Sequence, residues 1–150
     1  MTIDHSTKNK LIDFYYNDLS INDFEKWLYE NDYLEKFDEQ IYMLLIDINY
    51  KDKEEVNIGK RKLKDLYKIH YDVPIEIDKT RLILNKIITG ELAIDNGCRI
   101  LADLCANGNS FIPIVFEGYS SEIERLGDYS FYKDRIIKDA KKLLEELSSF

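Results

Sequence analysis

The chain has 150 residues, of which 45% are hydrophobic and 33% charged, with 21 Lys and Arg against 29 Asp and Glu. This composition is typical of a soluble globular protein and excludes collagen-like and disordered chains. The formal net charge of −8 argues against direct binding to nucleic acid or anionic lipid, because phosphate contacts need clustered basic side chains. The length suits one hydrophobic core, so we expect a single domain over residues 1–150.

The sequence shows neither a signal-peptide pattern nor an apolar run long enough to span a membrane. The first ten residues, MTIDHSTKNK, lack the basic and then apolar pattern of a signal peptide. The longest unbroken apolar run is FIPIVF at residues 111–116, far shorter than a bilayer span. We therefore expect a cytoplasmic protein.

Apolar spacing along the first half predicts four helices. The first is short and lies near residues 11–16, and the capping-box pattern SIND at 20–23 predicts the start of the second. A regular apolar stripe predicts a third helix over 38–49. A fourth is predicted over 56–69, where Gly59 should weaken it by about 1 kcal/mol relative to Ala.

The next helices include both cysteines of the chain. A helical face at 83–88 is followed by Gly90, which is well placed to end that helix in the left-handed conformation. Over 94–105, Cys98 and Cys105 fall on one apolar stripe, about 10.5 Å apart along the helix axis. A disulfide needs Cα atoms roughly 4.4–6.8 Å apart, so the two cysteines cannot bond to each other, and we interpret them as packing residues.

The last third is less regular before its final helix. Pro113 leaves residues 111–116 open between a short buried strand and an irregular turn. The pattern SEIE at 121–124 is a second capping box and predicts a short helix that ends at Gly127. A clear apolar face predicts the final helix over 136–147, so the predicted fold is all-α, with seven or eight short helices and at most a minor strand.

No motif predicts catalysis, a metal or a cofactor. GYSSE at 118–122 lacks the second glycine of a nucleophile elbow, and Arg61 stands where a phosphate loop after Lys60 needs Ser or Thr, so Lys60 is interpreted as a solvated helix charge. The only histidines, His5 and His70, are remote from the cysteines. We predict no enzyme and no catalytic, cofactor-binding or metal-binding residues.

The acidic charge is concentrated in one segment that is also rich in aromatic residues. Residues 13–39 carry nine acidic and two basic side chains, a net charge of −7, whereas residues 51–68 carry seven basic and four acidic ones. Phe24, Trp27 and Leu28 share a face and are expected in the core. Acids interleaved with exposed tyrosines suit a surface that binds a basic protein. The predicted partner-binding residues are Asp18, Glu25, Tyr29, Glu30, Asp32, Tyr33, Glu35, Asp38 and Glu39. A merely solvated acidic helix face fits the same pattern and stays open.

Two segments resemble a known family. DFEKWLYENDYLEKFDEQIYMLLIDINY at 23–50 and GCRILADLCANGNSFIPIVFEGYSSEIE at 97–124 resemble small acidic bacterial immunity proteins of polymorphic or contact-dependent growth inhibition toxin systems. The resemblance carries over no catalytic residue. It implies a cytoplasmic protein that binds a cognate toxin, often a nuclease, and blocks its active or another essential surface.

The leading hypothesis is therefore an immunity protein whose acidic segment contacts a basic toxin domain, with carboxylates taking the place of phosphates. The alternative is a helical adaptor or regulatory protein-interaction module, with homodimerisation through an exposed apolar face as one form of it. An enzyme in which scattered carboxylates converge on one pocket comes third. The sequence leaves the oligomeric state open.

Overall fold

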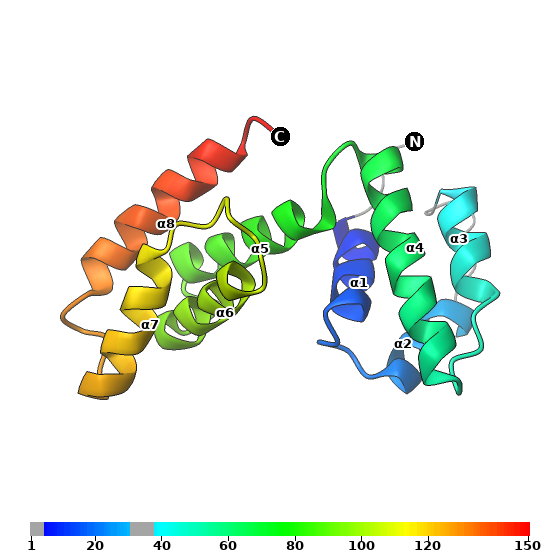
Figure 1. The fold of residues 1–150 in the computed structure, drawn as a ribbon, viewed down its shortest axis with the longest axis horizontal. Coiled ribbons are helices and arrows are strands. Elements are labelled where there is room, and N and C mark those ends of the chain that lie inside the picture. Colours follow the sequence, from blue (N-terminus) through cyan, green and yellow to red (C-terminus); the bar gives the residue numbers. More distant parts are fainter. Residues whose placement is uncertain (1–4, 31–37) are drawn as a thin grey trace. The chain divides into compact units, whose positions relative to one another are not determined.

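A computed structural model describes residues 5–30 and 38–150, and within them the fold is all-α, as predicted (Figure 1). The described residues form eight helices and no strand: α1 (His5–Tyr15), α2 (Ile21–Glu30), α3 (Glu39–Ile46), α4 (Lys53–Tyr71), α5 (Ile75–Thr89), α6 (Ile94–Ala106), α7 (Val115–Leu126) and α8 (Lys133–Leu147). The chain divides into two compact units, residues 1–75 and 76–150. The single domain predicted for residues 1–150 is not tested by this division and stays a prediction.

Unit 1 contains α1 to α4 and is centred on aromatic rings. Phe14 of α1 stacks on Phe24 of α2 with ring centroids 4.2 Å apart, and Tyr50 lies edge-on to Phe14 at 6.1 Å. Trp27 is only partly buried and packs beside Phe24 at 5.6 Å. The predicted burial of Phe24 and Leu28 is confirmed, since both have no exposed surface.

Gly59 lies on α4 at the point where the connection between α3 and α4 packs against this helix. A Cβ atom added to Gly59 would lie 2.4 Å from Cδ1 of Ile48, a buried residue of that connection. The sequence predicted only a weakened helix here. In the fold, the missing side chain makes room for Ile48, so part of the helix-propensity cost is offset by burial of an isoleucine.

Lys60 corrects a second expectation, because its ammonium group is not simply solvated. Its Nζ donates to the side-chain oxygen of Asn17 and lies 5.2 Å from the ring centroid of Phe14. Partial burial lowers the pKa of Lys60. Asn17 lies in the turn between α1 and α2 and has a φ of +61°, which asparagine tolerates better than most residues. Because Lys60 donates to the side chain of Asn17, it helps to hold this turn.

Unit 2 contains α5 to α8, with α6 and α7 in extensive contact. Gly97 of α6 faces Ile87 of α5, where an added Cβ would lie 2.4 Å from Cγ1 of that isoleucine. Gly90 and Gly127 both have positive φ, 81° and 70°, as the predicted helix ends at these glycines require. Cys98 is fully buried, and its burial raises the pKa of its thiol to about 12, in keeping with a packing role.

The structure decides the alternative left open at residues 111–116 and corrects the predicted start of the helix that follows. Residues 111–114 form turns rather than a strand, and α7 already begins at Val115, so the SEIE pattern lies inside a helix instead of starting one. Phe116, Tyr119 and Ile123 are buried at i, i+3 and i+7. Burial of this continuous apolar face outweighs the local capping preference of Ser121.

Candidate functional site

The candidate site lies on unit 1, where α2 passes the carboxyl end of α3. The hydroxyl of Ser20 accepts a hydrogen bond from the backbone N–H of Asp23 at 3.1 Å, so the predicted cap does start α2. Phe24 and Leu28 turn inward, which leaves Glu25 half-buried on the flank and Tyr29 exposed, as predicted.

Tyr29 is held in place although its ring is exposed. Its hydroxyl donates a hydrogen bond to the backbone carbonyl oxygen of Ile46, the last residue of α3, at 3.1 Å, while 54% of the residue's surface stays accessible. The hydroxyl is therefore used inside the molecule, and the ring face is what remains for a partner. An aromatic side chain fixed in this way binds with a small loss of conformational entropy.

A second tyrosine covers the neighbouring carbonyl group. The hydroxyl of Tyr50 donates to the backbone oxygen of Leu45 at 2.6 Å, and Tyr50 is 7% exposed. Burial, followed by the proximity of Tyr29 and Glu25, raises the pKa of Tyr50 well above its usual range. Tyr29 and Tyr50 donate to adjacent carbonyl groups at the end of α3, and Glu25 precedes Tyr29 by about one turn on α2.

The charges at this end are acidic although a helix carboxyl end favours cations. Neither α2 nor α3 has a basic residue in its last turn, and the exposed Asp47 is the C-cap of α3. Within the described ranges 5–30 and 38–150, no ion pair forms at Glu25 or Asp47. We name this group the α3-end surface, defined by Glu25, Tyr29, Asp47 and the Ile46 carbonyl.

The remaining predicted contact residues are placed elsewhere or only beside this surface. Glu30 is exposed at the end of α2 and lies 3.8 Å from Lys26, whereas Glu39 is exposed at the opposite, amino end of α3. That helix has 8 residues, so its two ends lie about 10 Å apart. Asp18 is exposed in the turn after α1. The other predicted contact residues, Asp32, Tyr33 and Glu35, lie outside the described residues.

Asp38 has both carboxylate oxygens engaged inside unit 1. Oδ1 accepts from the backbone N–H groups of Gln40 and Ile41 at 2.8 and 3.4 Å, which caps α3. Oδ2 lies 3.0 Å from Nδ1 of His70, whose Nε2 lies 2.7 Å from Oε1 of Gln40. Asp38 therefore joins the start of α3 to the end of α4. Sequence reasoning missed this pairing because 32 positions separate the two residues, and no local pattern marks it.

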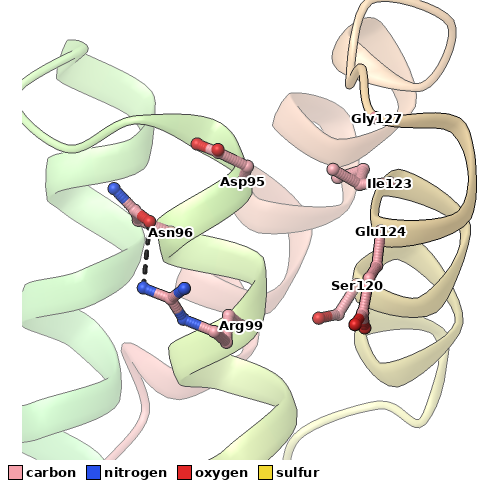
Figure 2. Close-up of a pocket in the computed structure, with 7 residues that line it drawn as sticks. All are labelled: Asp95, Asn96, Arg99, Ser120, Ile123, Glu124 and Gly127. Carbon is pink, nitrogen blue, oxygen red and sulfur yellow. Dashed lines mark hydrogen bonds between the residues drawn. The ribbon is translucent and has the colours of Figure 1, made fainter.

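A groove with polar walls lies on unit 2 (Figure 2). It lies between α6 and α7, has a volume of about 340 Å³, and is lined by Asp95, Asn96, Arg99, Ser120, Ile123, Glu124 and Gly127. Arg99 donates to the side-chain oxygen of Asn96 at 3.0 Å. Ser120 has no histidine beside it in the groove, so the arrangement lacks the base that an activated serine needs. Sequence reasoning gave no signal for this groove.

Two features are absent from the described part of the chain: a cluster of metal-binding side chains and a helix that could cross a membrane. Over these residues, no three or more His, Cys, Asp or Glu side chains gather as a metal site would require. No described helix has the length and apolar character needed to cross a bilayer. Comparison of the chain with family models, curated proteins and solved structures finds no match.

Proposed function

We propose that this protein is a non-enzymatic immunity protein that binds a basic toxin domain and blocks the toxin's essential surface. The α3-end surface is the proposed contact. The observation that carries the proposal is Tyr29, an exposed ring that its own hydroxyl fixes to the carbonyl of Ile46. Glu25 lies one turn before it on α2, Asp47 follows Ile46, and neither carboxylate forms an ion pair within the described residues.

Each part of the α3-end surface has a role in such a complex. The carboxylates of Glu25 and Asp47 attract a basic protein over several ångströms and raise the rate of association. The ring of Tyr29 supplies contact area, and tyrosine is among the residues that contribute most to binding energy at interfaces. Glu30 is exposed at the end of α2 and adds acidic charge to this part of unit 1, although it lies 3.8 Å from Lys26.

The proposed partner is a cytoplasmic toxin domain with a cationic cleft, such as that of a nuclease. Carboxylates that enter such a cleft occupy the positions of nucleic-acid phosphates and exclude the substrate. The resemblance of residues 23–50 and 97–124 to immunity proteins supports this partner over other basic proteins.

The experiment begins with the genes that adjoin the one for this protein. The carboxyl-terminal region of a large neighbouring gene product is expressed alone and together with this chain, and bacterial growth is measured. We expect growth arrest alone and rescue by co-expression. The variant Glu25→Gln/Tyr29→Ala/Glu30→Gln/Asp47→Asn should slow association by about tenfold at low salt and flatten its salt dependence.

The matched control neutralises exposed acids on unit 2. The variant Asp103→Asn/Glu124→Gln/Glu145→Gln changes a similar number of charges away from the α3-end surface. Rescue with equal association rates for both variants would remove the α3-end surface as the contact. Absence of any toxic neighbour, with binding to an unrelated protein instead, would favour the adaptor alternative.

A further inference from the structure

Three sides of α4, the longest of the described helices, are engaged within unit 1. The side that faces the core holds the buried residues Val56, Gly59, Leu63 and Tyr67. On the two flanks, Lys60 donates to Asn17 in the turn after α1, and His70 contacts Gln40 of α3. Figure 1 accordingly shows α1 and α3 on either side of α4. The fourth side of the helix faces solvent.

Four residues form one stripe along this fourth side: Ile58, Lys62, Asp65 and Ile69. They are spaced i, i+4, i+7 and i+11, which is the spacing of the contact positions in a two-stranded coiled coil. All four are exposed, and the exposed fractions of Ile58 and Ile69 are 40% and 70%. We name these four residues the α4 stripe.

The two charged residues of the α4 stripe have opposite sign. Neither Lys62 nor Asp65 forms an ion pair within residues 5–30 and 38–150. The order along the stripe is apolar, basic, acidic and apolar, so the stripe is complementary to a reversed copy of itself. In an antiparallel pair of such stripes, Ile58 lies opposite Ile69 and Lys62 lies opposite Asp65.

We propose that the α4 stripe is a contact between two copies of this chain, which pack α4 against α4 in antiparallel orientation. Such a contact is isologous, because a two-fold axis makes each pairing occur twice. Its centre contains two ion pairs between Lys62 and Asp65, and its ends contain two contacts between Ile58 and Ile69. Both pairings share one midpoint on α4, between positions 63 and 64, so a single register satisfies all four contacts.

A second copy fits the α4 stripe better than other occupants do. Nucleic acid and anionic lipid present only negative groups, which would pair with Lys62 and leave Asp65 facing like charge. A parallel copy would place Lys62 against Lys62 and Asp65 against Asp65. Arg61 and Lys68 are exposed beside the stripe and carry the same charge in both copies, so we expect a weak dimer.

The first test is sedimentation equilibrium of the full chain at concentrations from about 10 μM to about 1 mM, because a contact smaller than roughly 1,600 Å² is typical of weak association. A salt concentration of about 0.15 M screens the repulsion between two acidic chains. We expect the average mass to rise from that of one chain towards that of two. A chain that stays monomeric over this range would overturn the inference.

Charge reversal tests the antiparallel register. Lys62→Glu and Asp65→Lys should each raise the dissociation constant of the dimer at least about tenfold, because each places like charges opposite one another twice. An equimolar mixture of the two variants should associate again, since unlike charges then meet in both central pairs. Single variants that associate like the wild type, or a mixture that stays monomeric, would contradict this register.

A matched pair of substitutions tests the apolar ends of the contact. Ile69→Gln should raise the dissociation constant at least about fivefold, because it removes apolar area from both ends. Ile114→Gln changes an isoleucine that is 75% exposed on unit 2 and should leave the constant unchanged. Equal weakening by the two variants would count against the α4 stripe, and circular dichroism checks that both stay helical.

This inference stands apart from the proposed function. The α4 stripe shares no residue with the α3-end surface, so rescue from a toxin neither supports nor excludes the dimer. A monomeric chain that rescues growth would overturn the inference alone, whereas a dimer without a toxic neighbour would count against the immunity role alone.

Discussion

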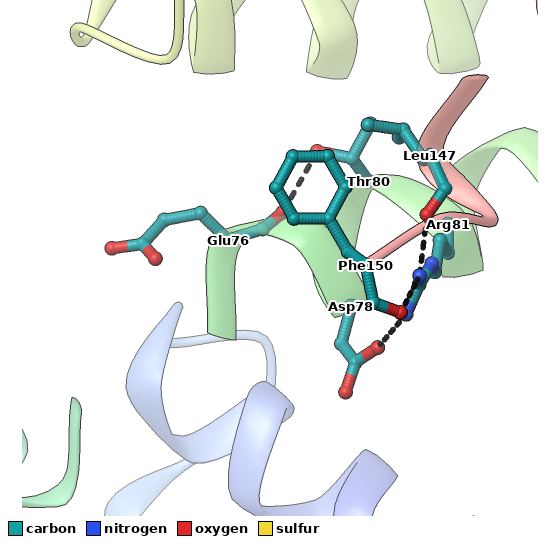
Figure 3. A network of polar contacts seen from close by, with 6 residues as sticks. All are labelled: Glu76, Asp78, Thr80, Arg81, Leu147 and Phe150. Atoms are coloured by element: carbon teal, nitrogen blue, oxygen red, sulfur yellow. Dashed lines mark hydrogen bonds and ion pairs between the residues drawn. The ribbon is translucent and has the colours of Figure 1, made fainter. Parts of the chain in front are cut away.

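The carboxyl ends of α3 and α8 solve the same problem with different chemistry. Both ends have acidic residues nearby, Asp47 in the first case and Glu145 and Glu146 in the second, although a helix dipole favours cations there. At α8 the guanidinium of Arg81 supplies both hydrogen bonds and positive charge (Figure 3). At α3 the hydroxyls of Tyr29 and Tyr50 supply hydrogen bonds alone.

The difference separates two demands that are often treated as one. Backbone oxygens at a helix end need hydrogen-bond donors for stability, and neutral hydroxyls meet that need. Among the described residues no cation balances the charge there, so the end of α3 has hydrogen-bond donors but no basic partner within residues 5–30 and 38–150. The end of α8 is satisfied in both respects, which makes it a structural feature of unit 2.

The largest expected effect comes from removing Arg81. Arg81→Met should remove the guanidinium's hydrogen bonds to the backbone oxygens of Leu147 and Phe150 and its ion pair with Asp78, whose side chain is 15% exposed. The free energy of unfolding should fall by about 2 kcal/mol, the range for hydrogen bonds to charged groups. Urea unfolding followed by circular dichroism measures this, and hydrogen exchange should accelerate over residues 144–150.

Arg99→Met is the matched control, because the Arg99 guanidinium is exposed and its hydrogen bond goes to a neighbouring Asn96. It should change stability by less than about 0.5 kcal/mol. Equal losses for the two variants would contradict the structural role given to Arg81.

Removing the hydroxyl of Tyr50 should cost about 1 kcal/mol. Tyr50→Phe removes a buried hydroxyl donor from the Leu45 carbonyl oxygen, which keeps the backbone N–H groups of Asp47 and Ile48. Tyr29→Phe acts at an exposed carbonyl that water can reach and should cost less. Trp27 is the only tryptophan of the chain, so its fluorescence reports the unfolding of unit 1. A larger loss from Tyr29→Phe than from Tyr50→Phe would show that the exposed bond matters more to the fold.

Placing a cation at the end of α3 should stabilise the fold and weaken binding. Asp47→Lys should raise the free energy of unfolding by about 0.3–1 kcal/mol at low salt and slow association with a basic partner. Glu146→Lys, near the end already covered by Arg81, should gain less stability. Faster association of the Asp47→Lys variant would contradict the proposed role of the α3-end surface.

The smallest effect concerns alkaline pH. Tyr119 is buried on α7 and its hydroxyl donates to Asp139, and burial followed by this contact raises the pKa of Tyr119 from 10.0 to about 12. Because the fold favours the neutral phenol, this contribution to stability is complete below the unfolded pKa and is lost as pH rises through the folded value. Stability of wild type and Tyr119→Phe should therefore differ by a constant amount below about pH 9 and converge at higher pH. Convergence on acidification instead would show that the sign is wrong.

The sequence predicted helices best where apolar spacing and end signals agree. α2 follows the cap at Ser20, α3 follows Asp38, and α5 ends before Gly90 as the pattern indicated. The predicted start of the helix at Ser121 was wrong, and α7 begins at Val115. The capping pattern at Ser121 stabilises a helix less than burial of Phe116 and Tyr119 does.

The candidate site was predictable only in part. Charge and helical spacing indicated Glu25 and exposed Tyr29, and the structure brings these two together at the end of α3. Charge and helical spacing did not indicate that Asp47 belongs to the site. They also did not indicate that the carboxylate of Asp38 lies 3.0 Å from the imidazole of His70. Whether a carboxylate faces solvent or an internal partner depends on contacts between helices, which periodicity does not encode.

By itself the sequence determined that this chain is helical, acidic and equipped with an exposed tyrosine among carboxylates, because helical periodicity and net charge are local sums over neighbouring residues. The tertiary structure decided which helix end receives the guanidinium of Arg81 and which receives the hydroxyl of Tyr29. These two pairings join residues 66 and 17 positions apart, and only the packing of helices against one another brings such residues within hydrogen-bond distance.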